Sequence, residues 1–177
     1  AERYFRSYQA AIAAIGAEAR GRGPVEAPGI SIKLSALHPR FEFAQAARVH
    51  GELTPRVAEL ARQAKAVGIG FTVDAEEADR LDLSLDVIEG VAADPSLAGW
   101  DGFGLAVQAY QKRALPLLDW LADLARRSRR RLMVRLVKGA YWDSEIKRSQ
   151  ERGLAGYPVF TRKVATDVSY IACARRL

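Results

Sequence analysis

Apolar residues recur along the chain in two patterns, one typical of β-strands and the other of α-helices. Short apolar runs bounded by turn residues predict four strands, at residues 29–35, 69–75, 103–109 and 132–137. After each strand, apolar residues recur every three or four positions, which predicts helices, at residues 43–67, 76–94, 113–128, 143–153 and 159–177. Strands that alternate with helices of this length indicate βαβ units and a parallel sheet.

Individual residues mark the expected limits and buried faces of these helices. Pro55 is expected to begin the main part of the first helix and Gly68 to end it, while the third helix is expected to start near Pro116. The apolar stripe of the second helix is expected at Leu81, Leu85 and Ile88. Residues 1–28 are expected to form a preceding helix and linker, so that the four βα units occupy residues 29–177.

Each predicted strand has one bulky apolar face, because successive side chains point to opposite faces of a sheet. These faces hold Ile30, Ile32 and Leu34; Ile69, Phe71 and Val73; Phe103, Leu105 and Val107; and Leu132, Val134 and Leu136. The opposite faces are smaller or more polar. A doubly wound sheet is covered by helices on both faces, so both faces of its strands tend to be apolar. One apolar face and one polar face are typical of a barrel with helices on the outside only. The pattern therefore indicates an α/β chain that forms part of a (β/α)8 barrel. No G-x-G-x-x-G sequence follows a strand, which argues against a Rossmann dinucleotide site.

A hydrogen-bonding side chain lies near the carboxyl end of each polar face. The four are Lys33, Asp74, Gln108 and Arg135, and barrel active sites lie at the carboxyl ends of the strands. Two cations, a carboxylate and an amide suit a charged ligand held by hydrogen bonds. Lys33 and Gln108 could instead lie on an exposed strand face, and Asp74 could cap the next helix. Arg135 is the strongest argument for a ligand, because its strand neighbours are apolar and an unpaired buried guanidinium is costly.

Composition and charge narrow the function classes. With 177 residues, 49% of them apolar, the chain is expected to form a globular domain. Its net charge of +6 reflects arginines clustered at residues 126–131 and 175–176. No aromatic residues interleave with these arginines, so a solvated helix end is favoured over a nucleic-acid surface. No apolar run reaches the ~20 residues of a membrane-spanning helix, and no signal peptide is expected.

The single cysteine excludes an internal disulfide and fits a cytoplasmic location. Cys173 is expected to be a small buried residue on a helix. His38 and His50 have no partner at a metal-ligand spacing, so no metal site is expected.

Four stretches of the chain resemble the proline dehydrogenase domain of bacterial proline utilization A, a bifunctional flavoenzyme of proline catabolism. They read SIKLSALHPRFE, DAEEADRLDLSLDVIE, GWDGFGLAVQAYQKR and RRSRRRLMVRLVKGAYWDSEIKRSQERGLAGYPVFTRKVATDVSYIACARRL. The resemblance covers residues 29–177 well and residues 1–28 only loosely. It implies that residues 29–177 form the N-terminal half of a distorted (β/α)8 barrel.

The resemblance also implies an activity. FAD would accept a hydride at N5 as L-proline is oxidised to Δ1-pyrroline-5-carboxylate, and the electrons would pass to a membrane quinone. The enzyme would be cytoplasmic, with peripheral contact at the inner face of the cell membrane in the full-length protein.

The resemblance assigns roles to residues of this chain. It implies that Lys33 binds the proline carboxylate and that Tyr141 packs against the proline ring. Asp74 would border both substrate and flavin, and Arg135 would lie near flavin N5. The implied flavin contacts are Asp74, Ala75, Ala106, Gln108, Arg135, Val137, Lys138, Gly139, Ala140, Tyr141 and Trp142.

The chain departs from the family in length, since a full barrel takes about 250 residues and this chain has 177. The later strands are not in the sequence, nor is the last helix, whose arginine pair grips the proline carboxylate. We therefore expect an excerpt of a longer protein, with negligible proline oxidation by the isolated chain. The alternative is a non-catalytic barrel fragment that serves as a scaffold or interaction module. Nucleic-acid binding is not expected through this segment.

Overall fold

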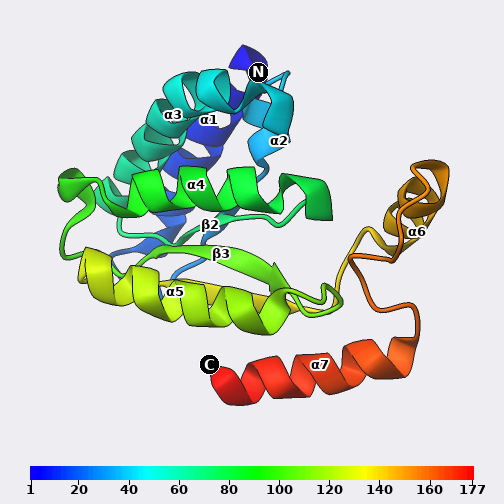
Figure 1. Ribbon diagram of the computed structural model, residues 1–177. Coiled ribbons are helices and arrows are strands. Elements are labelled where there is room, and N and C mark those ends of the chain that lie inside the picture. The colour runs from blue at the N-terminus through cyan, green and yellow to red at the C-terminus, as the bar shows by residue number, and fades with distance from the viewer.

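Four parallel strands form one sheet in the computed structural model, which describes residues 1–177 (Figure 1). The strands are β1 Ile30–Ile32, β2 Phe71–Val73, β3 Phe103–Gln108 and β4 Met133–Val137. They lie in chain order, each paired with the next. The helices are α1 Glu2–Ala19, α2 Leu34–Leu37, α3 Ala46–Ala66, α4 Leu81–Ala92, α5 Ala114–Ser128, α6 Trp142–Glu151 and α7 Lys163–Arg176. The predicted α/β chain with four βα units is confirmed.

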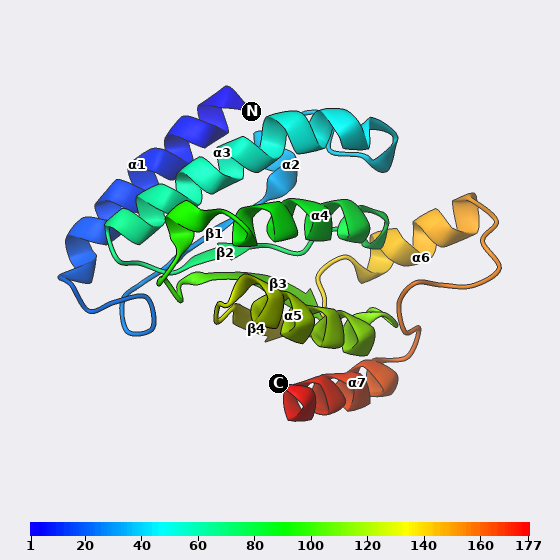
Figure 2. The ribbon, with the colours of Figure 1, turned by 60° about the vertical axis from the view of Figure 1, so that its left-hand side comes forward.

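The helices that follow the first three strands, α3, α4 and α5, lie along one side of the sheet (Figure 1 and Figure 2). α1 packs against α3, and α7 packs against α5. α6 projects beyond the end of the sheet in both views. None of the helices is both long and apolar enough to span a membrane.

The bulky faces of the strands pack into the core, as predicted. The core of 33 buried residues contains Ile32, Phe71, Val73, Phe103, Leu105 and Val107 from the strands. The rings of Phe71 and Phe103 stack with their centroids 6.4 Å apart. Val134 and Leu136 of β4 are half-buried against the same core. Cys173 of α7 is fully buried, as predicted.

The first strand is shorter than predicted. It ends at Ile32, and Leu34 opens the short helix α2. The amide of Asp74 still donates to the Ile32 carbonyl oxygen, but the amide of Ala36 donates to the Lys33 carbonyl oxygen in a turn. Leu34 is fully buried in helical rather than extended backbone. Lys33 therefore occupies the extended junction between β1 and α2, with φ −103° and ψ 129°.

Pro55 does not begin the main part of its helix, contrary to the prediction. Pro55 lies inside α3, which begins at Ala46. A proline lacks the N–H that would bond the carbonyl of Gly51, but both residues are exposed, so water can satisfy that carbonyl. Pro116 is the third residue of α5, so this helix starts near Pro116 as predicted. Gly68 follows the end of α3 as predicted, with φ +71°.

The buried face of α4 differs from the predicted stripe. Its apolar members are Leu83, Val87, Ile88, Val91 and Ala92. Leu81 and Leu85 are only half-buried, because they border a surface groove against Leu117 and Trp120 of α5 rather than the sheet. Only Ile88 of the predicted stripe lies in the core.

Close approach of two strands requires glycine at position 104. A Cβ atom at this position would clash with the carbonyl oxygen of Met133 on β4. Gly104→Ala is expected to destabilise the fold by about 1–3 kcal/mol, the usual effect of overpacking. At Gly51, by contrast, a new Cβ would meet no atom within 4 Å, and alanine favours the helix. Thermal unfolding followed by circular dichroism should therefore show a lower Tm for Gly104→Ala and no loss for Gly51→Ala. Equal Tm values would contradict the prediction.

Candidate active site

The carboxyl ends of the strands surround a cavity of about 300 Å³. It is lined by Lys33, Asp74, Ala75, Ala106, Gln108, Arg135, Val137, Lys138, Gly139, Ala140 and Tyr141. Every one of these residues belongs to the set expected from the sequence, and the remaining member, Trp142, lines an adjoining cavity. The structure thus brings the expected residues together, while their individual roles stay predictions.

Arg135 reaches across the sheet toward strands that are not its neighbours. Its guanidinium donates to Asp74 Oδ1, and to Ser31 Oγ at 2.9 Å. Arg135 is in register with Ala106 of β3, whose small side chain lets the guanidinium pass over this strand. The Arg135 side chain is 49% exposed, so the expectation of a buried arginine is wrong.

Asp74 is an ion-pair partner and not a helix cap. The helical turns that follow it have Glu77 and Arg80 at their N-cap positions, so the alternative role of Asp74 is wrong. Its carboxylate, only 20% exposed, faces Arg135 instead. The pair places a cation and a carboxylate side by side, so neither charge is left uncompensated at the cavity.

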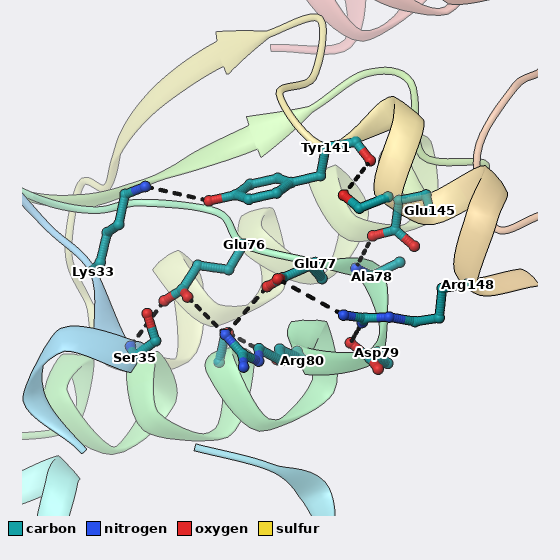
Figure 3. Close-up of polar contacts among 12 residues, drawn as sticks. Lys33, Ser35, Glu76, Glu77, Ala78, Asp79, Arg80, Tyr141, Glu145 and Arg148 are labelled. Carbon is teal, nitrogen blue, oxygen red and sulfur yellow. Dashed lines mark hydrogen bonds and ion pairs between the residues drawn. The ribbon is translucent and has the colours of Figure 1, made fainter. Parts of the chain in front are cut away.

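Lys33 and Tyr141 form a second polar pair at the cavity. Lys33 Nζ donates to the Tyr141 hydroxyl oxygen at 3.3 Å and lies 5.9 Å from the centre of the ring (Figure 3). The hydrogen bond to Tyr141 raises the pKa of Lys33, so the lysine is a cation at neutral pH. The Lys33 amide donates to the Tyr8 hydroxyl oxygen at 3.1 Å. α1 thus helps to hold the lysine, a long-range contact that no local sequence pattern indicates.

Gln108 connects two loops beside the cavity. It is buried, its Nε2 donates to the Glu76 carbonyl oxygen at 2.9 Å, and its Oε1 accepts from the Ala140 amide at 3.0 Å. The alternative that Gln108 lies on an exposed strand face is therefore wrong. Backbone groups buried in loops need such side-chain partners, because no strand ladder pairs them. Gln108 joins the loop after β2 to the loop after β4.

The loop after β4 passes so close to Tyr110 that residue 139 must be glycine. Gly139 has φ +147°, and a Cβ there would overlap the Tyr110 ring. Tyr110 is buried, and its hydroxyl has no hydrogen-bond partner. Burial raises the pKa of Tyr110, and the charge of Glu145 acts in the same direction, so the phenol stays neutral. Sequence reasoning missed Tyr110, since a single aromatic residue in a turn has no distinguishing pattern.

A second cavity, of about 410 Å³, adjoins the first through Lys138 and Gly139. It is lined by Tyr110, Lys138, Gly139, Trp142, Thr161, Lys163 and Thr166. Lys138 and Lys163 both pair with Asp167, at 2.6 and 2.7 Å, and lower the pKa of its carboxyl. Sequence reasoning missed the residues from 161 onward, because their place beside β4 depends on how the chain returns from α6.

Comparison with known families identifies the chain. All of it, residues 1–177, matches the family model for proline dehydrogenase. The chain belongs to the proline dehydrogenase family. It is 62% identical over 177 residues to the bifunctional protein PutA of Salmonella typhimurium. This alignment covers 100% of the chain but only 13% of the Salmonella protein.

Solved structures of proline utilization A share the fold of this chain. A mutant of Bradyrhizobium japonicum PutA matches with a TM-score of 0.98 and 64% identity, over 99% of this chain and 18% of that one. Bdellovibrio bacteriovorus PutA inactivated by N-propargylglycine matches with a TM-score of 0.89 and 25% identity, over 98% and 19% of the two chains. The four βα units are thus part of a TIM-type (β/α)8 barrel. The family predicted from the sequence is confirmed, and the match also includes residues 1–28.

Gln108→Leu tests whether this side chain holds the two loops together. Leucine fills a similar volume but leaves the Ala140 amide and the Glu76 carbonyl without a partner, which is expected to destabilise the protein by about 2 kcal/mol. Gln150→Leu is the matched control, because Gln150 is an exposed residue of α6 and should change stability by less than about 0.5 kcal/mol. Urea unfolding of both variants measures the difference. Equal midpoints would show that Gln108 does not hold the loops.

Proposed function

We propose that this chain forms part of the active site of an FAD-dependent proline dehydrogenase, which oxidises L-proline to Δ1-pyrroline-5-carboxylate. The observation that carries the proposal is the convergence of three cations, a carboxylate and a phenol on one cavity, in a chain that matches the family along its whole length. The proposed catalytic residues are Lys33, Asp74, Arg135 and Tyr141. Their place at the carboxyl ends of barrel strands is where such enzymes carry out their chemistry.

The two adjoining cavities suit a dinucleotide cofactor such as FAD. Gly139 lines both cavities, and the absence of a side chain lets it pack closely against the Tyr110 ring. Tyr110 contributes to the lining of the second cavity. The ammonium groups of Lys138 and Lys163 suit a pyrophosphate. To the flavin contacts expected from the sequence we add Tyr110, Thr161, Lys163 and Thr166.

The residues of the chain position substrate and charge. When bound, FAD supplies the hydride acceptor for the oxidation. The Lys33 ammonium binds the carboxylate of L-proline through a charge-assisted hydrogen bond, and Tyr141, which accepts from Lys33, places its ring at the same end of the cavity. Asp74 and Ser31 hold Arg135 over β3. Arg135 thereby keeps a fixed positive charge available to the electron density that the cofactor gains.

The activity of the whole protein is part of the same proposal. The chain spans 13% of the length of the Salmonella protein, and we propose that it is a segment of a longer polypeptide that completes the barrel. In this proposal residues 1–28 precede the barrel and residues 29–177 form its N-terminal half. The isolated chain would show negligible proline oxidation, because the arginine pair for the substrate carboxylate comes from the other half. Electrons would pass to a quinone, with the cytoplasmic enzyme in peripheral contact with the membrane.

The proposal predicts a flavoprotein that L-proline reduces. A polypeptide that contains this chain and the rest of its barrel should purify with bound flavin, and L-proline should bleach the visible flavin absorption. Arg135→Met should slow the bleaching by about tenfold or more, the effect of losing a charged hydrogen bond. Arg126→Met removes an arginine that is 77% exposed and should match the wild type. Bound flavin that L-proline never bleaches would refute the activity, and a polypeptide without flavin would favour the scaffold role.

Lys33→Met is expected to weaken substrate binding while the cofactor stays bound. Methionine keeps most of the length of the side chain but cannot donate to a carboxylate, so the KM for L-proline should rise by about 10- to 100-fold. The control is Lys147→Met, on the exposed side of α6. Steady-state kinetics and flavin content measure the two effects separately. An unchanged KM would end the assignment of Lys33 to the proline carboxylate.

A further inference from the structure

A buried glutamate lies outside both cavities, on the helix that follows the site. Glu145 of α6 is 3% exposed, and its Oε1 accepts from the Ala78 amide at 2.6 Å (Figure 3). Ala78 belongs to the segment of residues 74–80 that connects β2 to α4. Burial raises the pKa of Glu145, and the hydrogen bond from Ala78 opposes this rise. Burying a carboxylate at this position costs free energy, which indicates that the side chain has a specific role.

α6 is attached to the domain by polar contacts. Its two buried residues are Glu145 and Ser149, whereas an ordinary surface helix buries an apolar stripe. Arg148 pairs with Asp79 at 2.7 Å and reaches Glu77 at 3.9 Å, but the Arg148 side chain is 30% exposed and such pairs contribute little. The hydrogen bond from Ala78 to Glu145 is therefore the main buried link between α6 and the segment of residues 74–80.

The position of α6 sets the position of Tyr141. Tyr141 is the residue that immediately precedes α6, and its carbonyl oxygen accepts from the Glu145 amide at 2.9 Å and from Ser144 Oγ at 3.0 Å. The same tyrosine meets Lys33 through its hydroxyl (Figure 3). At the other end of the link, the segment of residues 74–80 begins with Asp74, the partner of Arg135. Glu145 thus joins the two segments that present the polar pairs of the cavity.

A second buried carboxylate makes the equivalent link on the other side. Glu76, 6% exposed, accepts from the Ser35 amide at 2.9 Å and from Arg80 at 3.1 Å. Ser35 lies two residues after Lys33. The loops that carry Lys33, Asp74 and Tyr141 are therefore joined in series by carboxylates that accept from backbone amides. Such charge-assisted bonds are shorter and stronger than neutral ones.

We propose that Glu145 is a positioning residue of the substrate site: by accepting from the Ala78 amide, it holds Tyr141 at the distance from Lys33 and Asp74 that proline binding requires. The inference rests on the proposed function, because it assigns Tyr141 and Lys33 to the substrate. It adds a residue that touches neither substrate nor cofactor and that acts through the backbone of α6.

Three variants in the complete enzyme test this inference. Glu145→Ala removes the acceptor and should raise the KM for L-proline by about tenfold, with a smaller change in kcat and with flavin still bound. Glu145→Gln keeps an oxygen that can accept from Ala78 and should restore most of the affinity. Glu151→Ala, which truncates an exposed glutamate of the same helix, is the matched control and should leave KM unchanged. Equal KM values for Glu145→Ala and the wild type would overturn the inference.

A double-mutant cycle separates positioning from general loss of stability. If Glu145 acts through Tyr141, Glu145→Ala should change KM by less than about twofold when introduced into Tyr141→Ala, since residues that act together are not additive. A tenfold rise in KM in both the wild-type and the Tyr141→Ala backgrounds would overturn the positioning role of Glu145.

Hydrogen exchange gives a readout that does not depend on activity. The amides of residue 78 and of residues 141–151 should exchange faster in Glu145→Ala and at the wild-type rate in Glu145→Gln. Unchanged exchange in Glu145→Ala would show that Glu145 does not hold α6. A wild-type enzyme that does not oxidise proline would refute the proposed function, while the exchange rates would still decide whether the link exists.

Discussion

The ion pair between Arg135 and Asp74 is the interaction on which the arrangement of the cavity depends. Arg135 comes from β4 and Asp74 follows β2, so the pair spans β3, the strand between them. It can form because β3 presents Gly104 and Ala106 on this face, opposite Met133 and Arg135 in the strand register. A larger residue at position 106 would fill the space that the guanidinium crosses, and one at position 104 would clash with Met133 of β4. The small residues of β3 thus shape both the ion pair and the cavity around it.

Polar side chains that reach backbone amides hold the loops around this pair. Glu76 accepts from Ser35, Gln108 from Ala140 and Glu145 from Ala78. Each acceptor is buried, and each donor belongs to the chain just beyond a strand, where no ladder satisfies the amide. The strands set the approximate positions of the site residues, and these cross-links set how the loops between them lie.

Local spacing made much of the fold predictable. The alternation of Phe71 with Thr72, or of Leu105 with Ala106, reflects the geometry of extended backbone, and the bulky members lie in the core as expected. Leu34 belongs to a helix rather than to the predicted strand, because an apolar residue suits a buried strand and a buried helix equally well. Pro55 lies inside a helix that it was predicted to begin, because the effect of a proline depends on whether water can hydrogen-bond the carbonyl group that it leaves unpaired. The local sequence pattern decides neither the secondary structure of Leu34 nor the position of Pro55 in its helix.

By itself, the sequence determined the order of the βα units, the bulky strand faces and the polar residues near the carboxyl end of each strand, because these follow from periodicities of a few residues. Only the tertiary structure decided which of those residues meet. It paired Arg135 with Asp74 rather than burying it, brought Tyr8 to the amide of Lys33 and placed Glu145 against Ala78. Such contacts join segments far apart in the chain, and their distances depend on strand register and on the course of the loops. For that reason the strand pattern predicted four polar residues of the cavity and the family resemblance implied the rest, whereas the bonds that hold the cavity could not be predicted.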